Sequence, residues 1–146
     1  GLIVGAVTLL VSEISYYAVF GELLPVAHPL YFFLFLFLGG VTFAYLGISV
    51  GFYSRSFDQL SAISGFILMP LIYLGGVFFS VEHLPGFWRN VSLVNPLLYL
   101  INGVRYGILG RADVAVETSL AVALVAFVLT GMLALVSLSR GSFHRW

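Results

Sequence analysis

Four long apolar segments with almost no charge constrain this chain more than any other feature of its sequence. They cover approximately residues 1–20, 30–52, 60–79 and 119–138. Each is close to the roughly 20 mainly apolar residues that a helix needs to cross a bilayer, and Glu13 is the single charged residue inside them. Helices satisfy their own backbone hydrogen bonds in lipid. We therefore predict an all-α, polytopic integral membrane protein with four transmembrane helices, forming a single transmembrane domain over residues 1–146.

The charge composition excludes several classes of function. Only 8% of the residues are charged, against about 25% in a soluble domain, and Lys is absent. The chain therefore has no basic face for nucleic acid and no lysine for a Walker A motif. With no Cys and three scattered His, we expect no metal site. Because no acid, base and nucleophile converge, we predict a chain that is not an enzyme and binds no cofactor itself.

Two features inside the apolar segments predict how the helices pack. Gly40, Ala44, Gly47 and Gly51 recur at helical spacing on one face, where small side chains let another helix backbone approach closely. Pro70 lies in the middle of the third segment and removes one backbone hydrogen bond. We therefore expect a kink at Pro70.

Glu13 is expected to have a partner or a function, because a charged side chain at the centre of a bilayer costs about 2.5–3.5 kcal/mol on insertion scales. One hypothesis is that Glu13, together with Ser12 and Ser15, lines a substrate path. The alternative is that Glu13 lies near the outer headgroups or pairs structurally with an arginine.

The segment 80–118 is expected to form an external helical hairpin. Its largely apolar part, 97–109, is too short to cross a bilayer. Three residues interrupt that part: Asn102, Gly103 and Arg105. Pro85 and Pro96 each stand where a helix could begin, so we predict two short helices in a re-entrant or interfacial hairpin. Four aromatic residues suit the headgroup layer: Phe87, Trp88, Tyr99 and Tyr106.

An ordered series of short motifs runs through the third apolar segment and this hairpin. It reads Pro70-Leu71, Tyr-Leu-Gly-Gly-Val-Phe-Phe at 73–79, Leu84-Pro85, Phe87-Trp88, Asn95-Pro96-Leu97-Leu98-Tyr99, Arg105-Tyr106-Gly107 and Leu109-Gly110. Its order and spacing resemble the ABC-2 type transporter permeases, the membrane subunits of ATP-driven exporters for drugs, polysaccharides and other bulky amphiphiles. The hydropathy of residues 1 to about 140 is similar to the last four of that family's six spans. We therefore expect the chain to be the C-terminal part of a longer permease.

The resemblance also implies an orientation and partners. The six arginines divide three against three between the two sides of four alternating spans, so the positive-inside rule alone favours neither side strongly. By the resemblance, residues 53–59 and the C-terminal tail face the cytoplasm, and 80–118 faces outwards. Arg55 and Asp58 would then lie nearest a cytoplasmic ABC ATPase subunit, which binds ATP and Mg. A second permease copy would complete a homodimer in a bacterial inner membrane.

Within the external hairpin the resemblance singles out four residues: Asn95, Pro96, Tyr99 and Arg105. Arg105 has two interpretations. It anchors the hairpin in the headgroup layer, or it holds the hairpin closed over the exit of the translocation path by pairing with Glu82 or Asp113. The expected function is a permease subunit that exports a drug, lipid or polysaccharide, in multidrug efflux for example. An ATP-independent channel or a membrane scaffold is the alternative.

Overall fold

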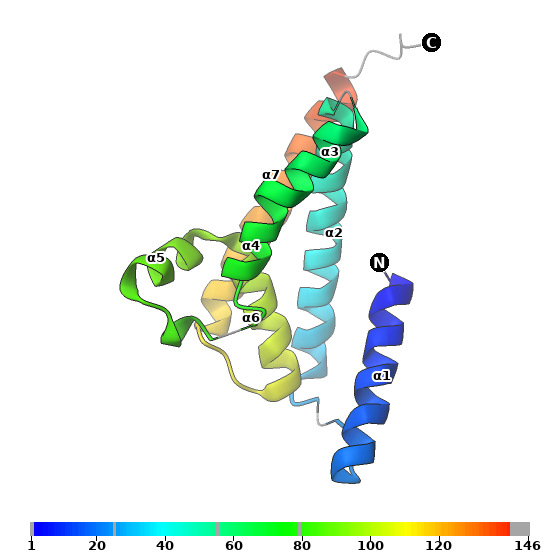
Figure 1. Cartoon of the computed structure of the whole chain (residues 1–146), viewed down its shortest axis with the longest axis vertical. Coiled ribbons are helices and arrows are strands. Elements are labelled where there is room, and N and C mark those ends of the chain that lie inside the picture. The colour runs from blue at the N-terminus through cyan, green and yellow to red at the C-terminus, as the bar shows by residue number, and fades with distance from the viewer. Residues whose placement is uncertain (1, 25, 55, 79, 141–146) are drawn as a thin grey trace.

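In a computed structural model of the chain, all the regular structure is helical within the described residues, which are 2–24, 26–54, 56–78 and 80–140 (Figure 1). The elements follow in the order α1 (Leu2–Phe20), α2 (Pro29–Tyr53), α3 (Phe57–Ile63), a π-helical turn η1 (Ser64–Leu68), α4 (Met69–Leu74), a 3-10 turn η2 (Val81–His83), α5 (Gly86–Val94), α6 (Pro96–Leu109) and α7 (Val116–Arg140). The prediction of an all-α chain is confirmed for these residues.

Three helical segments in the described part are long and apolar enough to cross a membrane. They are Pro29–Tyr53, Phe57–Leu74 and Val116–Ser139, which match the second, third and fourth predicted spans. The first predicted span is also helical, as α1, but its apolar part, Val7–Phe20, is shorter than a span. Three of the four predicted spans are therefore present as candidate membrane spans, and the first remains a prediction.

The third span differs from its predicted limits of 60–79. Its helix begins at Phe57, because the Ser56 hydroxyl accepts the N–H of Gln59 at 3.3 Å and caps the first turn. The helix ends at Leu74, because two glycines follow and Gly76 adopts a φ of 77° that other residues rarely take. Where a kink was predicted at Pro70, the structure has a π-helical turn, Ser64–Leu68, directly before the Met69-Pro70 start of α4.

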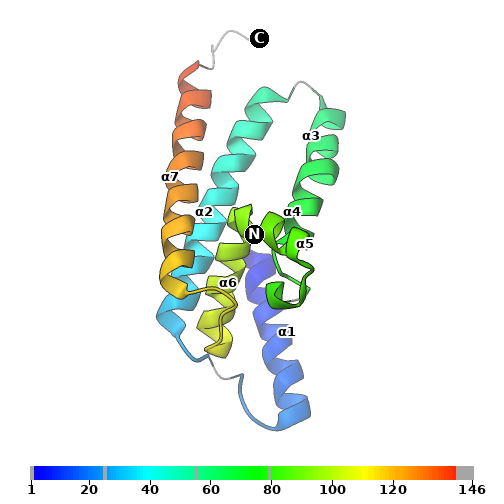
Figure 2. The same cartoon turned by 90° about the vertical axis from the view of Figure 1, so that its left-hand side faces the viewer.

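Helices α2, α6 and α7 form the packed centre of the molecule (Figure 2). One apolar cluster joins all three through Phe35, Leu38, Leu100 and Ala123. Small hydroxyl side chains line the buried faces of α2 and α7: Thr42, Ser49, Thr130 and Ser137. Three of these hydroxyls donate to a carbonyl one turn earlier in the same helix. Small residues of this kind let helices pack closely in lipid, where burial of apolar surface drives no association.

The second helix of the hairpin, α6, runs antiparallel along the first half of α2 at very short range. Gly107 lies against the backbone of Phe32, and Gly103 lies against the ring of Phe35. The α1–α2 linker then closes the end of α6, because the N–H groups of Ala27 and His28 donate to carbonyls of its last turn at 3.1 and 2.8 Å. These bonds satisfy carbonyls that a helix end leaves without partners. The two predicted helices of the hairpin are therefore present as α5 and α6, and their position in the membrane stays a prediction.

The predicted stripe of small residues on α2 has no neighbour in the described part of the chain. Its four residues are exposed, and a Cβ built on Gly40, Gly47 or Gly51 would have no atom within 4 Å. Close helix packing is carried instead by Gly103 and Gly107 of α6. Packing of the stripe against a further helix stays a prediction.

Replacing Gly107 with alanine tests the α2–α6 contact. The new Cβ would lie 2.6 Å from the Cα and N atoms of Phe32, and backbone atoms cannot move aside as a flexible side chain can. We expect Gly107→Ala to destabilise the protein by about 1–3 kcal/mol, as overpacked cores do. Thermal unfolding of the purified protein in detergent measures the change. Gly47→Ala, which meets open space, is the control, and equal melting temperatures for both variants would contradict this packing.

Candidate functional site

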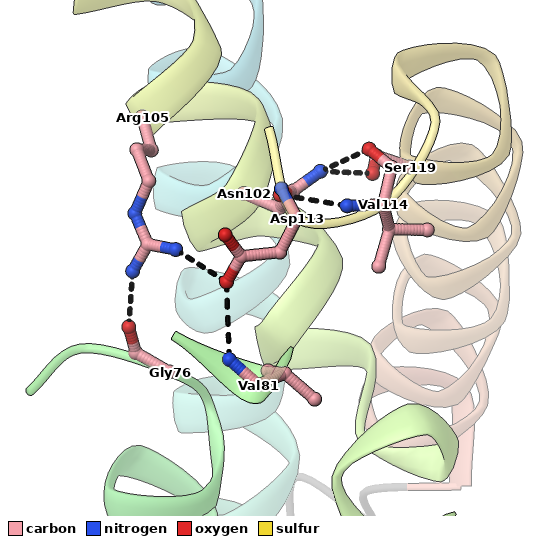
Figure 3. A network of polar contacts seen from close by, with 7 residues as sticks. All are labelled: Gly76, Val81, Asn102, Arg105, Asp113, Val114 and Ser119. Carbon is pink, nitrogen blue, oxygen red and sulfur yellow. Dashed lines mark hydrogen bonds and ion pairs between the residues drawn. The ribbon is translucent and has the colours of Figure 1, made fainter. Parts of the chain in front are cut away.

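A buried asparagine joins α6 to the start of α7. Asn102 is 1% exposed, and its Nδ2 donates to the Val114 carbonyl and to the Ser119 hydroxyl, both at 2.8 Å. Its Oδ1 accepts the N–H groups of Asp113 at 2.8 Å and Val114 at 3.3 Å. Figure 3 shows how one side chain holds the turn between the two helices from the inside. The turn cannot leave α6 without stranding several buried polar groups.

Asp113, which this turn positions, lies at the junction of three chain segments. Its Oδ2 accepts from Arg105 Nη1 of α6 at 2.7 Å and from the Val81 N–H of η2 at 3.1 Å. Arg105 Nη2 in turn donates to the carbonyl of Gly76, just after α4. One ion pair therefore ties together α6, the α6–α7 turn and the segment between α4 and α5 (Figure 3). We call these contacts, with those of Asn102, the hairpin network.

The surroundings of Asp113 favour its ionised form. Burial acts to raise its pKa, but hydrogen bonds from the Val81 N–H and the Ser80 hydroxyl, together with the charge of Arg105, outweigh burial. The pKa of Asp113 is consequently held below its ordinary value of 3.8. The pair with Arg105 is therefore charged on both sides at neutral pH.

Asn95 connects α6 to the end of α4. Its Oδ1 accepts the Leu97 N–H at 3.0 Å and caps α6, directly before Pro96 at the first position of that helix. Its Nδ2 donates to the Leu71 carbonyl at 2.7 Å. That carbonyl is available because the Gly75 N–H bonds to Ile72 as the helix ends. Asn95 thus fixes α6 to α4, and Arg105 fixes α6 to Gly76, just after α4, at a second point.

The aromatic residues of the hairpin divide into two groups, which corrects one expectation. Phe87 and Trp88 are exposed on α5, as a headgroup position requires. Tyr99 is buried instead, and its hydroxyl donates to the Leu93 carbonyl at 2.7 Å. Tyr106 stacks on His28 with ring centres 4.6 Å apart. Tyr99 therefore serves the packing of α6, whereas the headgroup position of the half-buried Tyr106 stays a prediction.

Arg105 pairs with an acid, as one of its two interpretations requires, and its anchoring in the headgroup layer stays a prediction. Asp113 is the partner, and the side chain of the other candidate, Glu82, lies outside the described residues. Asn102 and Ser119 belong to the same network but were not among the predicted site residues. The signal for Asn102 was an amide in an otherwise apolar 97–109 segment, while nothing in sequence placed Ser119 opposite it. Closure of an exit by Arg105 stays a prediction.

The remaining predicted site residues lie apart from the hairpin network. Glu13 accepts the Leu24 N–H at 3.1 Å, which folds the chain back along α1 after its end; Ser12 and Ser15 are exposed on the same helix. Asp58 is exposed in the first turn of α3, and Arg55 lies outside the described residues. No group of three His, Asp or Glu side chains in the described ranges could hold a metal ion.

Removing the Asn102 amide should loosen the turn between α6 and α7. Asn102→Ala leaves the Val114 carbonyl and the N–H groups of Asp113 and Val114 without their partner, and a buried group without a hydrogen bond costs about 1–3 kcal/mol. We expect a lower melting temperature and faster hydrogen exchange of residues 113–119. The exposed Asn90 of α5 supplies the control Asn90→Ala. Unchanged exchange in Asn102→Ala would show that the amide does not hold this turn.

The ion pair predicts a particular pH dependence. A carboxylate with a lowered pKa contributes stability above its ordinary pKa and loses that contribution as the pH falls through the lowered value. The stability difference between the unsubstituted protein and Asp113→Asn should therefore stay constant from about pH 7 to about pH 5 and shrink only below the ordinary value of 3.8. Unfolding measured across this range is the test, with Arg105→Gln expected to behave in the same way. A difference that already falls above pH 5 would contradict the assignment.

Comparison with known proteins places these helices in a family. The "Inner membrane transport permease YadH" of Escherichia coli K12 is 45% identical over 93 residues, which cover 64% of this chain and 36% of that protein. "Nodulation protein J" of Rhizobium meliloti is 30% identical over 73 residues, covering 50% of this chain and 28% of the relative. The chain thus spans about a third of the length of these curated relatives. No solved structure matches it.

The family assignment rests on a match over most of the chain. The family model described as "ABC-2 type transporter" matches residues 1–109, which include α6 and the segment between α4 and α5 but not the turn that carries Asp113. Such a membrane domain lacks the ATPase site, in agreement with the absence of lysine. The chain is a homologue of an inner membrane permease and carries apolar helices that could span a membrane. It belongs to the ABC-2 type transporter family as part of a membrane permease.

Proposed function

We propose that this chain is the membrane subunit of an ATP-driven exporter that moves an amphiphilic or bulky substrate, such as a drug, lipid or polysaccharide, out across a bacterial inner membrane. The family match over residues 1–109 carries the proposal. Permeases of this family pair with an ABC ATPase, so ATP and Mg bind to that partner. The direction of transport and the class of substrate rest on the resemblance of the hairpin motifs.

Movement would enter through the end of the molecule where α2 meets α3. Asp58 lies there in the first turn of α3, exposed, and Arg55 belongs to the same turn in sequence. Helix α3 continues through η1 into α4, which is tied to α6 at Leu71 by Asn95 and at Gly76 by Arg105. A push on α3 by the ATPase would therefore reach the hairpin through hydrogen-bonded contacts.

The hairpin network would hold the outer end closed between transport cycles. Asp113 joins the hairpin to the turn before α7, so breaking its ion pair with Arg105 would remove one of the contacts between α6 and that turn. Packed elements joined in this way shift between two discrete arrangements rather than deforming gradually. In this scheme α1 also crosses the membrane, as the first predicted span, and presents Ser12, Glu13 and Ser15 to the substrate path. A second permease copy lies against the small-residue stripe of α2 at Gly40, Ala44, Gly47 and Gly51.

Purification of the whole protein from its own membranes, in mild detergent, tests this function. We expect a near-stoichiometric partner that carries a Walker A motif, and ATP hydrolysis in the purified complex. The proposed contact at α3 predicts that Asp58→Arg lowers recovery of that partner by reversing one charge at the interface.

Glu117→Arg supplies a matched control, since Glu117 is also an exposed acid in the first turn of a spanning helix, at the opposite end of the bundle (Figure 1). It should leave recovery of the partner unchanged. Equal loss in both variants would place the contact elsewhere. Recovery of the permease alone, from membranes in which another ABC complex stays intact, would favour an ATP-independent channel or a membrane scaffold.

A further inference from the structure

Helix α1 stands beside the packed centre and is joined to it by the linker 21–28 (Figure 1). Among the described residues, α1 has no extended contact with any other helix. The chain turns directly after α1, at Gly21, which has a φ of 74°. Since packing holds α1 so little, its position depends on how the linker is held.

The far end of the linker is fixed to α6. The N–H groups of Ala27 and His28 donate to carbonyls of the last turn of α6 at 3.1 and 2.8 Å. The ring of His28 also stacks on Tyr106 of that turn, with ring centres 4.6 Å apart. A displacement of α6 would therefore act directly on this end of the linker.

The near end of the linker is fixed to α1 by one side chain. The N–H of Leu24 donates to Glu13 Oε1 at 3.1 Å. Glu13 precedes the last residue of α1, Phe20, by seven residues, which is about 10 Å along the helix. Three extended residues after Gly21 reach about as far, so the linker returns beside the last two turns of α1.

Glu13 differs from its neighbours on α1 in a way that fits this contact. It is half-buried, whereas Ser12, Ile14 and Ser15 are exposed. A backbone N–H that runs beside an apolar helix needs an acceptor, because lipid offers none. The carboxyl group of Glu13 supplies that acceptor for Leu24.

We propose that Glu13 is a positioning residue: its carboxyl oxygen holds the linker against α1, and the linker, fixed to α6 at its other end, sets where α1 stands beside the bundle. The property required at position 13 is an acceptor oxygen and not a negative charge. Contact with a substrate would instead use the charge. The inference needs neither substrate nor ATPase, so it stands or falls separately from the proposed export function.

Hydrogen exchange in the whole protein, reconstituted in lipid nanodiscs, tests the contact. Glu13→Leu removes the acceptor, and the Leu24 amide should exchange about 2- to 10-fold faster, as the loss of one hydrogen bond predicts. Glu13→Gln keeps an acceptor oxygen without the charge, and exchange should stay close to that of the unsubstituted protein. Glu22→Leu is the matched control, because Glu22 is an exposed acid in the same linker, and it should change nothing. Leucine suits an apolar helix, so Glu13→Leu should fold.

A distance measurement tests whether the linker sets the position of α1. Spin labels at Leu10→Cys of α1 and Leu109→Cys of α6 use two exposed sites in a chain without cysteine; any cysteine elsewhere in the whole protein is replaced first. Labelled copies are diluted with unlabelled ones, so that the distance lies within one copy. We expect a narrow distance distribution in the unsubstituted protein and in Glu13→Gln, and a broad or shifted one in Glu13→Leu.

Three results would overturn the proposal. Unchanged exchange of Leu24 in Glu13→Leu would show that the contact is not made. Equal effects of Glu13→Gln and Glu13→Leu would show that the charge is what matters. Faster exchange with an unchanged distance distribution would show that something other than the linker holds α1.

Discussion

Backbone groups at the ends of a helix must find hydrogen-bond partners outside it, and this requirement explains most of the contacts around α6. This helix has 14 residues, too few to cross a bilayer, and both of its ends have partners within the protein. Asn95 caps its beginning, the N–H groups of Ala27 and His28 close its end, and Asn102 satisfies the following turn. Each end of α6, and the turn that follows it, therefore has a hydrogen-bond partner of its own.

The same contacts make the hairpin a joint between spanning helices. Helix α3–α4 touches the packed centre chiefly through α6, and Asn95 and Arg105 supply the hydrogen bonds of that contact. Asp113 then connects α6 to the segment before α5 and lies at the start of α7. A displacement of α4 would therefore act on α6 through these hydrogen bonds.

The glycines of α2 and α6 serve two different purposes in one chain. At Gly103 and Gly107 residues of the neighbouring helix α2 fill the space that a side chain would take, which brings α2 and α6 together. At Gly40 the missing side chain leaves space open to the outside of the bundle. Residue type alone does not separate these cases, because both kinds of glycine recur at helical spacing on an apolar helix. Only the position of the second helix does.

Hydropathy and motif order determined the family, the all-helical fold and the three long spans, because lipid permits few alternatives for a segment of about 20 apolar residues. Sequence also placed a hairpin between the third and fourth spans, through two prolines and an apolar stretch too short to cross. It did not determine that Tyr99 is buried, that Arg105 pairs with Asp113, or that Ser119 meets Asn102. Those contacts join residues that are distant in sequence. Their partners follow from the close approach of α6 to α2 and from the turn that folds α7 back beside it, and both exist only in the tertiary structure.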